Sequence, residues 1–428
     1  MHFIGEQLHG FEERLTSDIY PGDFGWSVNW DEPDRRLEWY HNTSSINQAG
    51  PCIRSNQLDF DEEVMFKSTR YLYAAARRKP SDRPFCLTVS LTHPHDPYTI
   101  HKKYWDRYEN QDIPMPDVNI PDEDQDPHSK RLLHVEGLTE EKPPDEAILR
   151  ARRAYFGAVS YVDDNVGRIL EVLRECGLDE NTIVIFSADH GDMLGERGLW
   201  YKMSWFEGSA RVPLLISYPQ RFTTKTIPQN VSSLDLLPTL VDLVGGSIDP
   251  RLPLDGNSLL PYLESANGLD ITNDTVYGEY AGEGTIAPLM MIRRGPWKFV
   301  TCPVDPPQLF NLRTDPNELQ NLATSQTPEI RNVFTSFVKE ANERWNFTNI
   351  HDEVLRSQRS RRVCWDALTR GRFESWDYQP KEEAREKYIR SNVPLDELEL
   401  RARYPPVDQF GHELPRGNAK GIAGSYNQ

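Results

Sequence analysis

The spacing of hydrophobic and polar positions predicts long helices separated by short apolar segments. Residues 147–176 carry apolar side chains three or four positions apart, which predicts one long amphipathic helix. Residues 61–77 open with acidic side chains and close with basic ones, as the helix dipole favours, and they predict a second helix. A third helix is predicted for residues 232–244, which end at a pair of glycines.

Three short apolar runs between these helices predict buried strands, at residues 85–92, 182–188 and 212–218. Continuous apolar runs are typical of strands that are covered on both faces. Buried strands that alternate with helices indicate an α/β domain, with a mainly parallel sheet flanked by helices.

The pattern changes near residue 271 to closely spaced short strands followed by a helix at 328–344. The strands are predicted at 276–280, 288–293 and 297–301. This spacing indicates a smaller α+β subdomain with an antiparallel sheet. The chain is therefore expected to divide into three parts. They are an α/β domain at 1–270, a C-terminal α+β subdomain at 271–375 and a tail at 376–428 that contacts other copies of the chain.

Two segments show no sustained period. Residues 11–60 are rich in Trp, Tyr, Asp, Pro and Asn and are expected to form a long functional loop region, because linkers do not carry this many tryptophans. Residues 110–146 are dominated by Pro, Asp and Glu and are expected to be an exposed excursion.

Composition narrows the possible partners. The 428 residues carry 48 basic and 66 acidic side chains, a formal charge of 48 − 66 = −18, which disfavours nucleic acid and leaves a small molecule as the expected ligand. The longest apolar runs have the length of strands, which argues against a membrane span. Five scattered cysteines suggest neither a disulfide framework nor a zinc site, so free thiols and a cytoplasmic location are expected.

A carboxylate and an imidazole follow the predicted strand 182–188 directly, as Asp189 and His190. Open α/β sheets bind ligands at the carboxyl ends of their strands, and this oxygen and nitrogen pair suits a divalent cation. The alternative is that Asp189 caps a turn and His190 bonds a loop.

Two further loops carry candidate chemistry. Lys202 lies between aromatic residues, and an ammonium near a metal suits an anion such as sulfate or phosphate. His93 and His95 lie in a proline-bounded loop after the predicted strand 85–92, where they could bind an oxyanion or transfer a proton. A solvated lysine and ordinary loop histidines are the alternatives.

Three segments together resemble the sulfatase family of the alkaline-phosphatase superfold. They are Thr-His-Pro-His-Asp-Pro-Tyr at 92–98, Ala-Asp-His-Gly-Asp-Met-Leu-Gly-Glu at 188–196, and Leu-Phe-Asn-Leu followed by Asp-Pro-Asn-Glu at 309–318. Segments at 1–3, 7–15, 18–26 and 401–405 extend the resemblance over nearly the whole chain, toward the choline sulfatases within that family.

The resemblance implies roles for several residues. Asp189 and His190 match two metal ligands, for calcium or otherwise manganese or magnesium, and Lys202 matches the lysine that holds the sulfate oxygens. His95 matches the histidine that protonates the leaving alcohol, with His93 as the other candidate. His2 matches the histidine that assists the nucleophile.

The resemblance also implies a site for the choline head and an oligomer. Trp26 matches an aromatic platform for a quaternary ammonium, with His41, Asn42 and Glu279 as its neighbours. A cation without N–H donors is best bound by a π face beside a carboxylate, which agrees with this assignment. Homo-oligomers are expected from the family.

One family feature is missing. Sulfatases make a formylglycine nucleophile from a C/S-x-P/A-S-R segment, which does not occur in the sequence, and two early carboxylates that complete the metal site are also absent. The nearest candidate, residues 50–55, has the wrong order. We therefore expect an N-terminally truncated sulfatase that does not hydrolyse choline-O-sulfate as printed. A phosphonate or phosphate ester hydrolase of the same superfold and a non-catalytic choline-binding protein are the alternatives.

Overall fold

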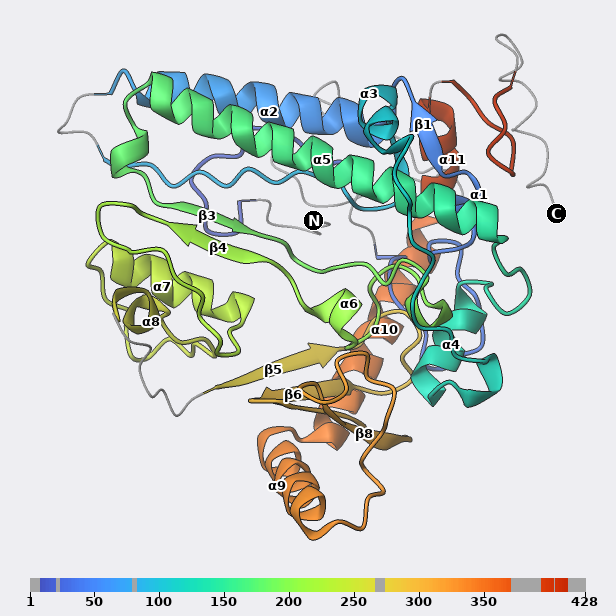
Figure 1. Ribbon diagram of the computed structural model, residues 1–428. Helices are drawn as coiled ribbons and strands as arrows, with labels where there is room; N and C mark the ends of the chain where they lie inside the picture. The colour runs from blue at the N-terminus through green and yellow to red at the C-terminus, as the bar shows by residue number, and fades with distance from the viewer. Residues whose placement is uncertain are drawn as a thin grey trace.

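The computed structural model describes residues 8–20, 24–78, 83–265, 274–370, 394–403 and 405–414. Two long helices, α2 (Asn56–Ala75) and α5 (Asp145–Glu175), lie side by side along one edge of the molecule (Figure 1). Short strands lie beneath them, and a four-stranded sheet with α9 forms the opposite end. Within the described residues, no helix combines the length and the apolar character that a membrane crossing requires.

The two long helices confirm the predictions from helical spacing. α2 begins five residues before the predicted start, because the Ser55 side chain accepts a hydrogen bond from the Leu58 backbone and caps the helix. α5 buries alanines spaced three or four residues apart, which lets strand and helix backbones approach closely. A side chain at Gly157 would lie 3.1 Å from Ile100.

Strand pairing in the first 265 residues differs from the predicted, mainly parallel arrangement. β1 (Gly50–Cys52) pairs in parallel with β2 (Thr99–His101), whereas β3 (Val184–Ser187) pairs antiparallel with β4 (Leu214–Ser217). Parallel neighbours require a crossover, usually a helix. The connection from β3 to β4 contains site loops and only the one-turn helix α6 (Glu207–Ala210), so the chain returns antiparallel. β3 and β4 are also only partly buried.

The prediction of a buried strand at residues 85–92 is wrong. This segment is extended, but it pairs with no other described segment and its side chains are half-buried or exposed. An apolar run forms a strand only where a neighbouring strand offers hydrogen bonds, and sequence pattern alone does not reveal the neighbour.

The C-terminal subdomain confirms the predicted antiparallel sheet. β5 (Thr275–Tyr280), β6 (Leu289–Arg294), β7 (Trp297–Cys302) and β8 (Asp305–Asn311) follow one another in order. Helix α9 (Pro328–Arg344) has the predicted bounds and covers one face, where Phe337 stacks on Phe299 at 5.7 Å between ring centres.

The segment at 110–146 is not wholly the exposed excursion that was predicted. Helix α4 (Pro127–Val135) buries Leu132, Leu133 and Val135 in the core. Its acidic neighbour Asp126 is the helix cap, which accepts from the His128 and Ser129 backbones, so an acidic residue here marks a helix start rather than an exposed loop.

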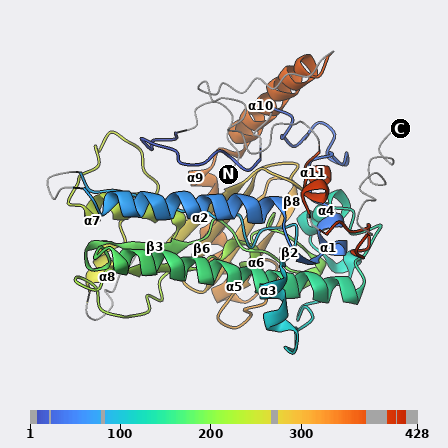
Figure 2. The ribbon, with the colours of Figure 1, turned by 90° about the horizontal axis from the view of Figure 1, so that it is seen from above.

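Helix α10 (Phe347–Leu368) was not predicted and extends away from the rest of the molecule (Figure 2). Gln358 is its one buried residue, and the apolar side chains of its first half, Phe347, Ile350, Val354 and Leu355, are only partly buried against two apolar clusters. The remaining short elements are α1 (Ser44–Asn47), α3 (Lys102–Trp105), α7 (Leu236–Leu243), α8 (Leu260–Glu264), α11 (Leu395–Ala402) and the 3-10 turns Asp106–Tyr108, Asp122–Asp124, Asp179–Asn181, Glu196–Gly198 and Ser233–Asp235.

Candidate active site

The Asp61 carboxylate on α2 fixes the loop at residues 92–98. It accepts hydrogen bonds from the backbones of Thr92 at 2.6 Å and His93 at 3.1 Å, and from His93 Nδ1 at 2.7 Å. The His93 side chain is therefore buried against α2 and lies 5.1 Å from the Tyr161 ring. His95 is turned the other way, toward Lys202.

Asp192 joins three predicted motifs. One carboxylate oxygen accepts from the Leu194 and Tyr201 backbones at 2.9 and 3.2 Å, and the other accepts from the Tyr98 hydroxyl at 2.9 Å. Tyr201 has a positive φ of 60°, and its backbone bond to Asp192 holds it in this rarely populated conformation. Burial raises the pKa of Asp192 to about 7. Asp192 thus ties the loop after β3 to the loop at 92–98 and to the residue before Lys202.

Lys202 lies between two imidazole rings. Its Nζ donates to His95 Nε2 at 2.6 Å and lies 3.0 Å from His41 Nε2. His95 Nδ1 donates to the Asp96 carbonyl at 2.7 Å, so Nε2 is free to accept from the ammonium. Burial and the Lys202 ammonium lower the pKa of His95 to about 3, and this ring is neutral.

His41, in contrast to the neutral His95, is positively charged. Its Nδ1 lies 3.0 and 3.2 Å from the Glu283 carboxylate oxygens, and its Nε2 lies 3.5 Å from Asp96. Burial and Lys202 lower the pKa of His41, but Glu283 and Asp96 outweigh them and raise it to about 10. An imidazolium cannot accept from Lys202, so two cationic groups face each other 3.0 Å apart. An anion between them would relieve this repulsion.

Carboxylates behind the rings hold the cationic groups in place. The pKa of Asp96 is held well below its usual range, because His95, His41 and Lys202 outweigh the effect of burial. Glu136 is completely buried, and burial raises its pKa well above the usual value.

Asp189 and His190 lie next to this cluster and remain open. His190 Nδ1 donates to the Gly191 carbonyl at 2.8 Å, which leaves Nε2 unprotonated and 3.8 Å from Asp189 Oδ2. Burial and Lys202 lower the pKa of His190, which keeps the ring in its neutral, ligating form. The Asp189 side chain is 78% exposed. This donor pair fits a divalent cation.

A second group of donors, His41, His95 and Asp96, also lies within 4.8 Å of one another. The Lys202 ammonium, however, contacts both imidazoles of this group at 3.0 Å or less. A divalent cation at that position would be repelled by the ammonium, which argues for an anion rather than a cation at this group.

The residues expected around a choline head are dispersed. Trp26 stacks on Trp39 at 6.4 Å, and Trp39 contacts Tyr40 edge-on at 4.7 Å, one residue before His41. The Asn42 side chain donates to Asp396 of α11 and orders the turn at Ser44. Glu279 accepts from the Trp345 indole at 2.7 Å, with no contact to His41 described.

The structure therefore brings together His95, Lys202, His41 and His190, with Asn42 following His41. Trp26 is connected to the segment before His41 through Trp39, whereas Glu279 bonds to Trp345 instead, and His2 lies outside the described residues. Sequence reasoning did not identify Asp61, Asp192 or Glu283 as holding the site. Glu283 follows β5 between two glycines, and this carboxylate in a tight turn after a strand was the only local signal.

The nearest formylglycine candidate does not form a reactive site. Cys52 ends β1, is buried, and has a pKa raised to about 11 by burial. A thiolate is the reactive form of cysteine, so this thiol is inert near neutral pH.

Three family profiles match the chain. They are described as Sulfatase at residues 19–246, Choline sulfatase enzyme C terminal at 352–404, and N-sulphoglucosamine sulphohydrolase, C-terminal, at 195–344. The first covers more than half of the chain.

Whole-chain relatives agree with these profiles. A choline-sulfatase of Rhizobium meliloti is 44% identical over 412 residues, which cover 95% of this chain and 80% of that protein. An arylsulfatase of Clostridium perfringens is 32% identical, covering 76% of this chain and 70% of that protein.

Solved structures support the fold. A phosphonate monoester hydrolase of Silicibacter pomeroyi superposes with a TM-score of 0.58 at 21% identity, over 79% of this chain and 72% of that one. A phosphonate monoester hydrolase of Agrobacterium radiobacter gives 0.54 at 24%, over 66% of this chain and 60% of that one. The chain thus spans about three fifths of that enzyme. From the profiles and the sequence relatives together, the chain belongs to the sulfatase family of sulfuric ester hydrolases, on the choline-sulfatase branch.

Proposed function

We propose that this chain binds choline-O-sulfate and carries the leaving-group side of a choline-sulfatase active site. The observation that carries the proposal is the position of Lys202 between an imidazolium, His41, and a neutral imidazole, His95. Two cationic groups 3.0 Å apart form a preorganised site for the oxygens of a sulfate ester.

The sulfate would replace unfavourable contacts with favourable ones. Lys202 and His41 both offer N–H donors, and hydrogen bonds between charged partners are about twice as strong as neutral ones. The Glu283 carboxylate keeps His41 charged from its Nδ1 side, away from Lys202, and the Asp96 carboxylate does so from the Nε2 side, 3.5 Å from that nitrogen.

His95 would serve as the proton donor to the leaving alcohol. Its ring is neutral beside a bare Lys202 ammonium, and a nearby anion favours the protonated form. Binding of the sulfate ester would thus favour protonation of His95, the acid that its leaving alcohol needs. The Asp96 carbonyl holds Nδ1 and so aims Nε2 at the anion.

The choline head would lie on the aromatic side of His41. The half-buried Trp26 offers a π face close to the segment that carries His41 and Asn42. A carboxylate beside that face would complete the site, and both Glu279 and Glu283 belong to the segment at the end of β5. The formal charge of −18 attracts a cationic head.

Asp189 Oδ2 and His190 Nε2 would hold a divalent cation beside the anion. When bound, such an ion stabilises negative charge on the sulfuryl oxygens. Calcium favours oxygen ligands, whereas manganese accepts a nitrogen more readily, and metal-binding titrations distinguish these candidates.

Binding and turnover are expected to separate in this chain. The family nucleophile derives from a C/S-x-P/A-S-R segment that the sequence does not contain. Residues 1–428 are therefore expected to bind choline-O-sulfate without hydrolysing it, and appreciable turnover with a divalent cation present would contradict this expectation.

Calorimetric titration of residues 1–428 with choline-O-sulfate, choline and an aryl phosphonate monoester tests the proposal. We expect choline-O-sulfate to bind more tightly than either of the others, because it alone engages both halves of the site. Tighter binding of the phosphonate would instead favour a phosphonate ester hydrolase. Binding of choline as tight as that of its sulfate ester would favour a choline-binding protein.

A further inference from the structure

A lysine of the C-terminal sheet reaches back to the segment that follows Lys202. Lys298 on β7 is 1% exposed, and its Nζ donates to the Trp205 carbonyl at 2.7 Å. The same ammonium lies 2.8 Å from one Glu318 oxygen and 2.5 Å from a Glu207 oxygen. A buried cation thus joins the sheet to both sides of the start of α6.

Glu318 completes this junction. Its second carboxylate oxygen accepts from the Glu207 backbone at 2.8 Å. Glu318 has a positive φ of 54°, and the Arg197 guanidinium donates to its carbonyl at 3.0 Å while lying 4.0 Å above the Phe206 ring. Backbone in this conformation persists where the surroundings over-determine it.

Helix α6 connects the junction to the site. The Ser209 hydroxyl donates to the Lys202 carbonyl, and the Ser209 carbonyl accepts from the Gly191 backbone at 2.7 Å. A side chain on Gly191 would clash with the Gly208 carbonyl, so the two segments touch. Any displacement of α6 would therefore move both Lys202 and the residue after His190.

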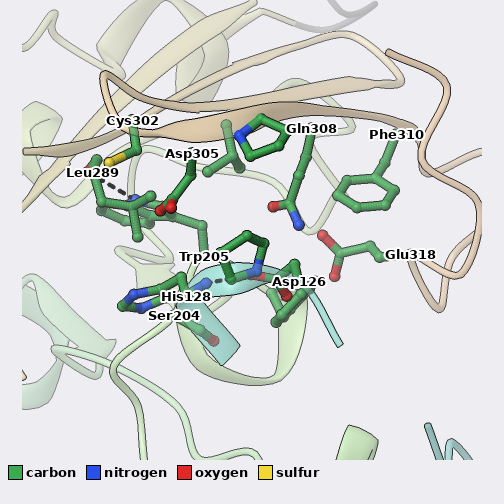
Figure 3. A pocket seen from close by; sticks show the side chains of 14 residues that line it. Asp126, His128, Ser204, Trp205, Leu289, Cys302, Asp305, Gln308, Phe310 and Glu318 are labelled. Carbon is green, nitrogen blue, oxygen red and sulfur yellow. Dashed lines mark hydrogen bonds between the residues drawn. The ribbon is translucent and has the colours of Figure 1, made fainter. Parts of the chain in front are cut away.

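Apolar packing holds the segment together with the ion pair: the Phe206 and Phe310 ring centres lie 6.4 Å apart, and the Trp205 indole donates to the Leu289 carbonyl at 3.1 Å. A small open pocket lies between the segment and the sheet, with Cys302, Gln308 and Phe310 on the sheet side and His128 and Ser204 on the other (Figure 3). The buried Ser204 hydroxyl has no hydrogen-bond partner among the described residues. The ion pair adds to this packing two bonds that reach the backbone of the segment, at the Trp205 carbonyl and the Glu207 N–H.

We propose that Lys298 and Glu318 are positioning residues that set the place of Lys202 in the anion site. The motif at 309–318, which has no contact with the anion site, would then act on it through α6. This inference rests on the proposed function, because it assigns the two residues a role in sulfate binding.

The test is a comparison of sulfate affinity and thermal stability in the full chain. The double variant Lys298→Met with Glu318→Gln removes the bond to the Trp205 carbonyl and both buried charges of the pair; the Glu207 carboxylate loses its Lys298 partner but is 28% exposed and so remains in contact with water. Neutral replacement of a buried ion pair often preserves stability. We expect the dissociation constant for inorganic sulfate, measured by calorimetry, to rise about tenfold, as for loss of other residues that orient a ligand-binding group.

Arg294→Met is the matched control. Arg294 of β6 forms a bidentate pair with Glu340 of α9 at 2.6 and 2.8 Å, and no described contact joins it to the segment at 202–207. This variant is expected to lower the melting temperature and to leave sulfate affinity unchanged. A double variant whose affinity stays within about twofold of the unaltered chain would overturn the positioning role, as would an equal loss in Arg294→Met.

The variant Lys202→Met distinguishes failure of the anion site from failure of the positioning role. If it loses sulfate binding while the double variant does not, the anion site stands and the positioning role fails. If Lys202→Met binds sulfate as the unaltered chain does, or the unaltered chain binds none, the anion site itself fails and the positioning role fails with it.

Discussion

The anion cluster and the cation pair lie side by side but are built differently. In the cluster of His41, His95 and Lys202, each side chain has a protein partner, and the rings are largely buried. In the pair, Asp189 is 78% exposed and only one nitrogen of His190 is held. The ring centres of His95 and His190 lie 5.7 Å apart, so the cluster and the pair are directly adjacent.

The difference shows which half of the chemistry this chain can preorganise alone. A buried cluster pays its desolvation cost during folding, so an anion finds its donors already aimed. A cation needs more ligands than two, and the Asp189 and His190 pair supplies only two of them. Anion binding should therefore be tighter and more sensitive to single substitutions than cation binding.

The largest effect is expected from Lys202→Met. This change removes the central ammonium and its charge-assisted bonds, each worth about 1.5–3 kcal/mol, so sulfate should bind more than about 100-fold more weakly. Calorimetry at low ionic strength measures the change. Equal weakening of cation binding would contradict the separation of the two arrangements.

Asp189→Asn should produce the converse result. Loss of the carboxylate charge is expected to weaken binding of manganese or calcium by roughly 10- to 100-fold, while sulfate affinity measured without metal stays near its original value. A metal titration followed by calorimetry tests both. If sulfate affinity fell as much as metal affinity, the assignment of the cation to this pair would be wrong.

Glu283→Gln should expose the protonation state of His41. With Glu283 present, the pKa of His41 is about 10, above its ordinary value of about 6.5. This charge therefore contributes stability that is fully present below about pH 6.5 and lost as pH rises through about 10. Without Glu283, burial and Lys202 should lower the pKa, so sulfate binding at pH 8 is expected to weaken about tenfold.

The control for Glu283→Gln is the same measurement at pH 5.5, where His41 in the variant regains more of its charge and the difference from the unaltered chain should shrink. Comparison at matched pH cancels the titration of Asp192, which both proteins share. A difference that stays constant from pH 5.5 to 8 would show that Glu283 acts through packing instead.

The smallest effect is expected from Trp26→Ala. A cation–π contact at a partly exposed ring contributes about 0.5–1 kcal/mol, so choline-O-sulfate should bind about two- to fivefold more weakly. Inorganic sulfate lacks the cationic head, and its affinity should be unchanged. Equal loss for both ligands would place Trp26 outside the choline site.

Sequence predicted the elements whose own side chains decide their structure. α5 and α9 carry complete apolar stripes, and the residues of β5 to β7 follow closely spaced strand patterns. It did not predict α10, whose one buried residue bonds to Trp30, or the pairing of β3 with β4. These features depend on partners distant in the chain.

The site shows the same division. His95, Lys202, Asp189 and His190 follow strands or lie in rigid loops, and their chemistry is visible locally. The carboxylates that set their charge states are not. Glu283 lies 242 residues from His41 along the chain, and Asp61 reaches His93 from a helix. No local pattern records such a pairing, because only the fold brings the groups together.

The bond from Asn42 to Asp396 spans 354 residues, and Tyr20 reaches Glu399 across 379. During synthesis, these contacts of the first 60 residues can therefore form only after nearly the entire chain has been translated. A domain with contacts this distant in sequence completes its folding late, and its N-terminal segments stay exposed until then. Ribosome-bound intermediates should thus remain protease-sensitive around residues 20–42 until α11 has left the exit tunnel.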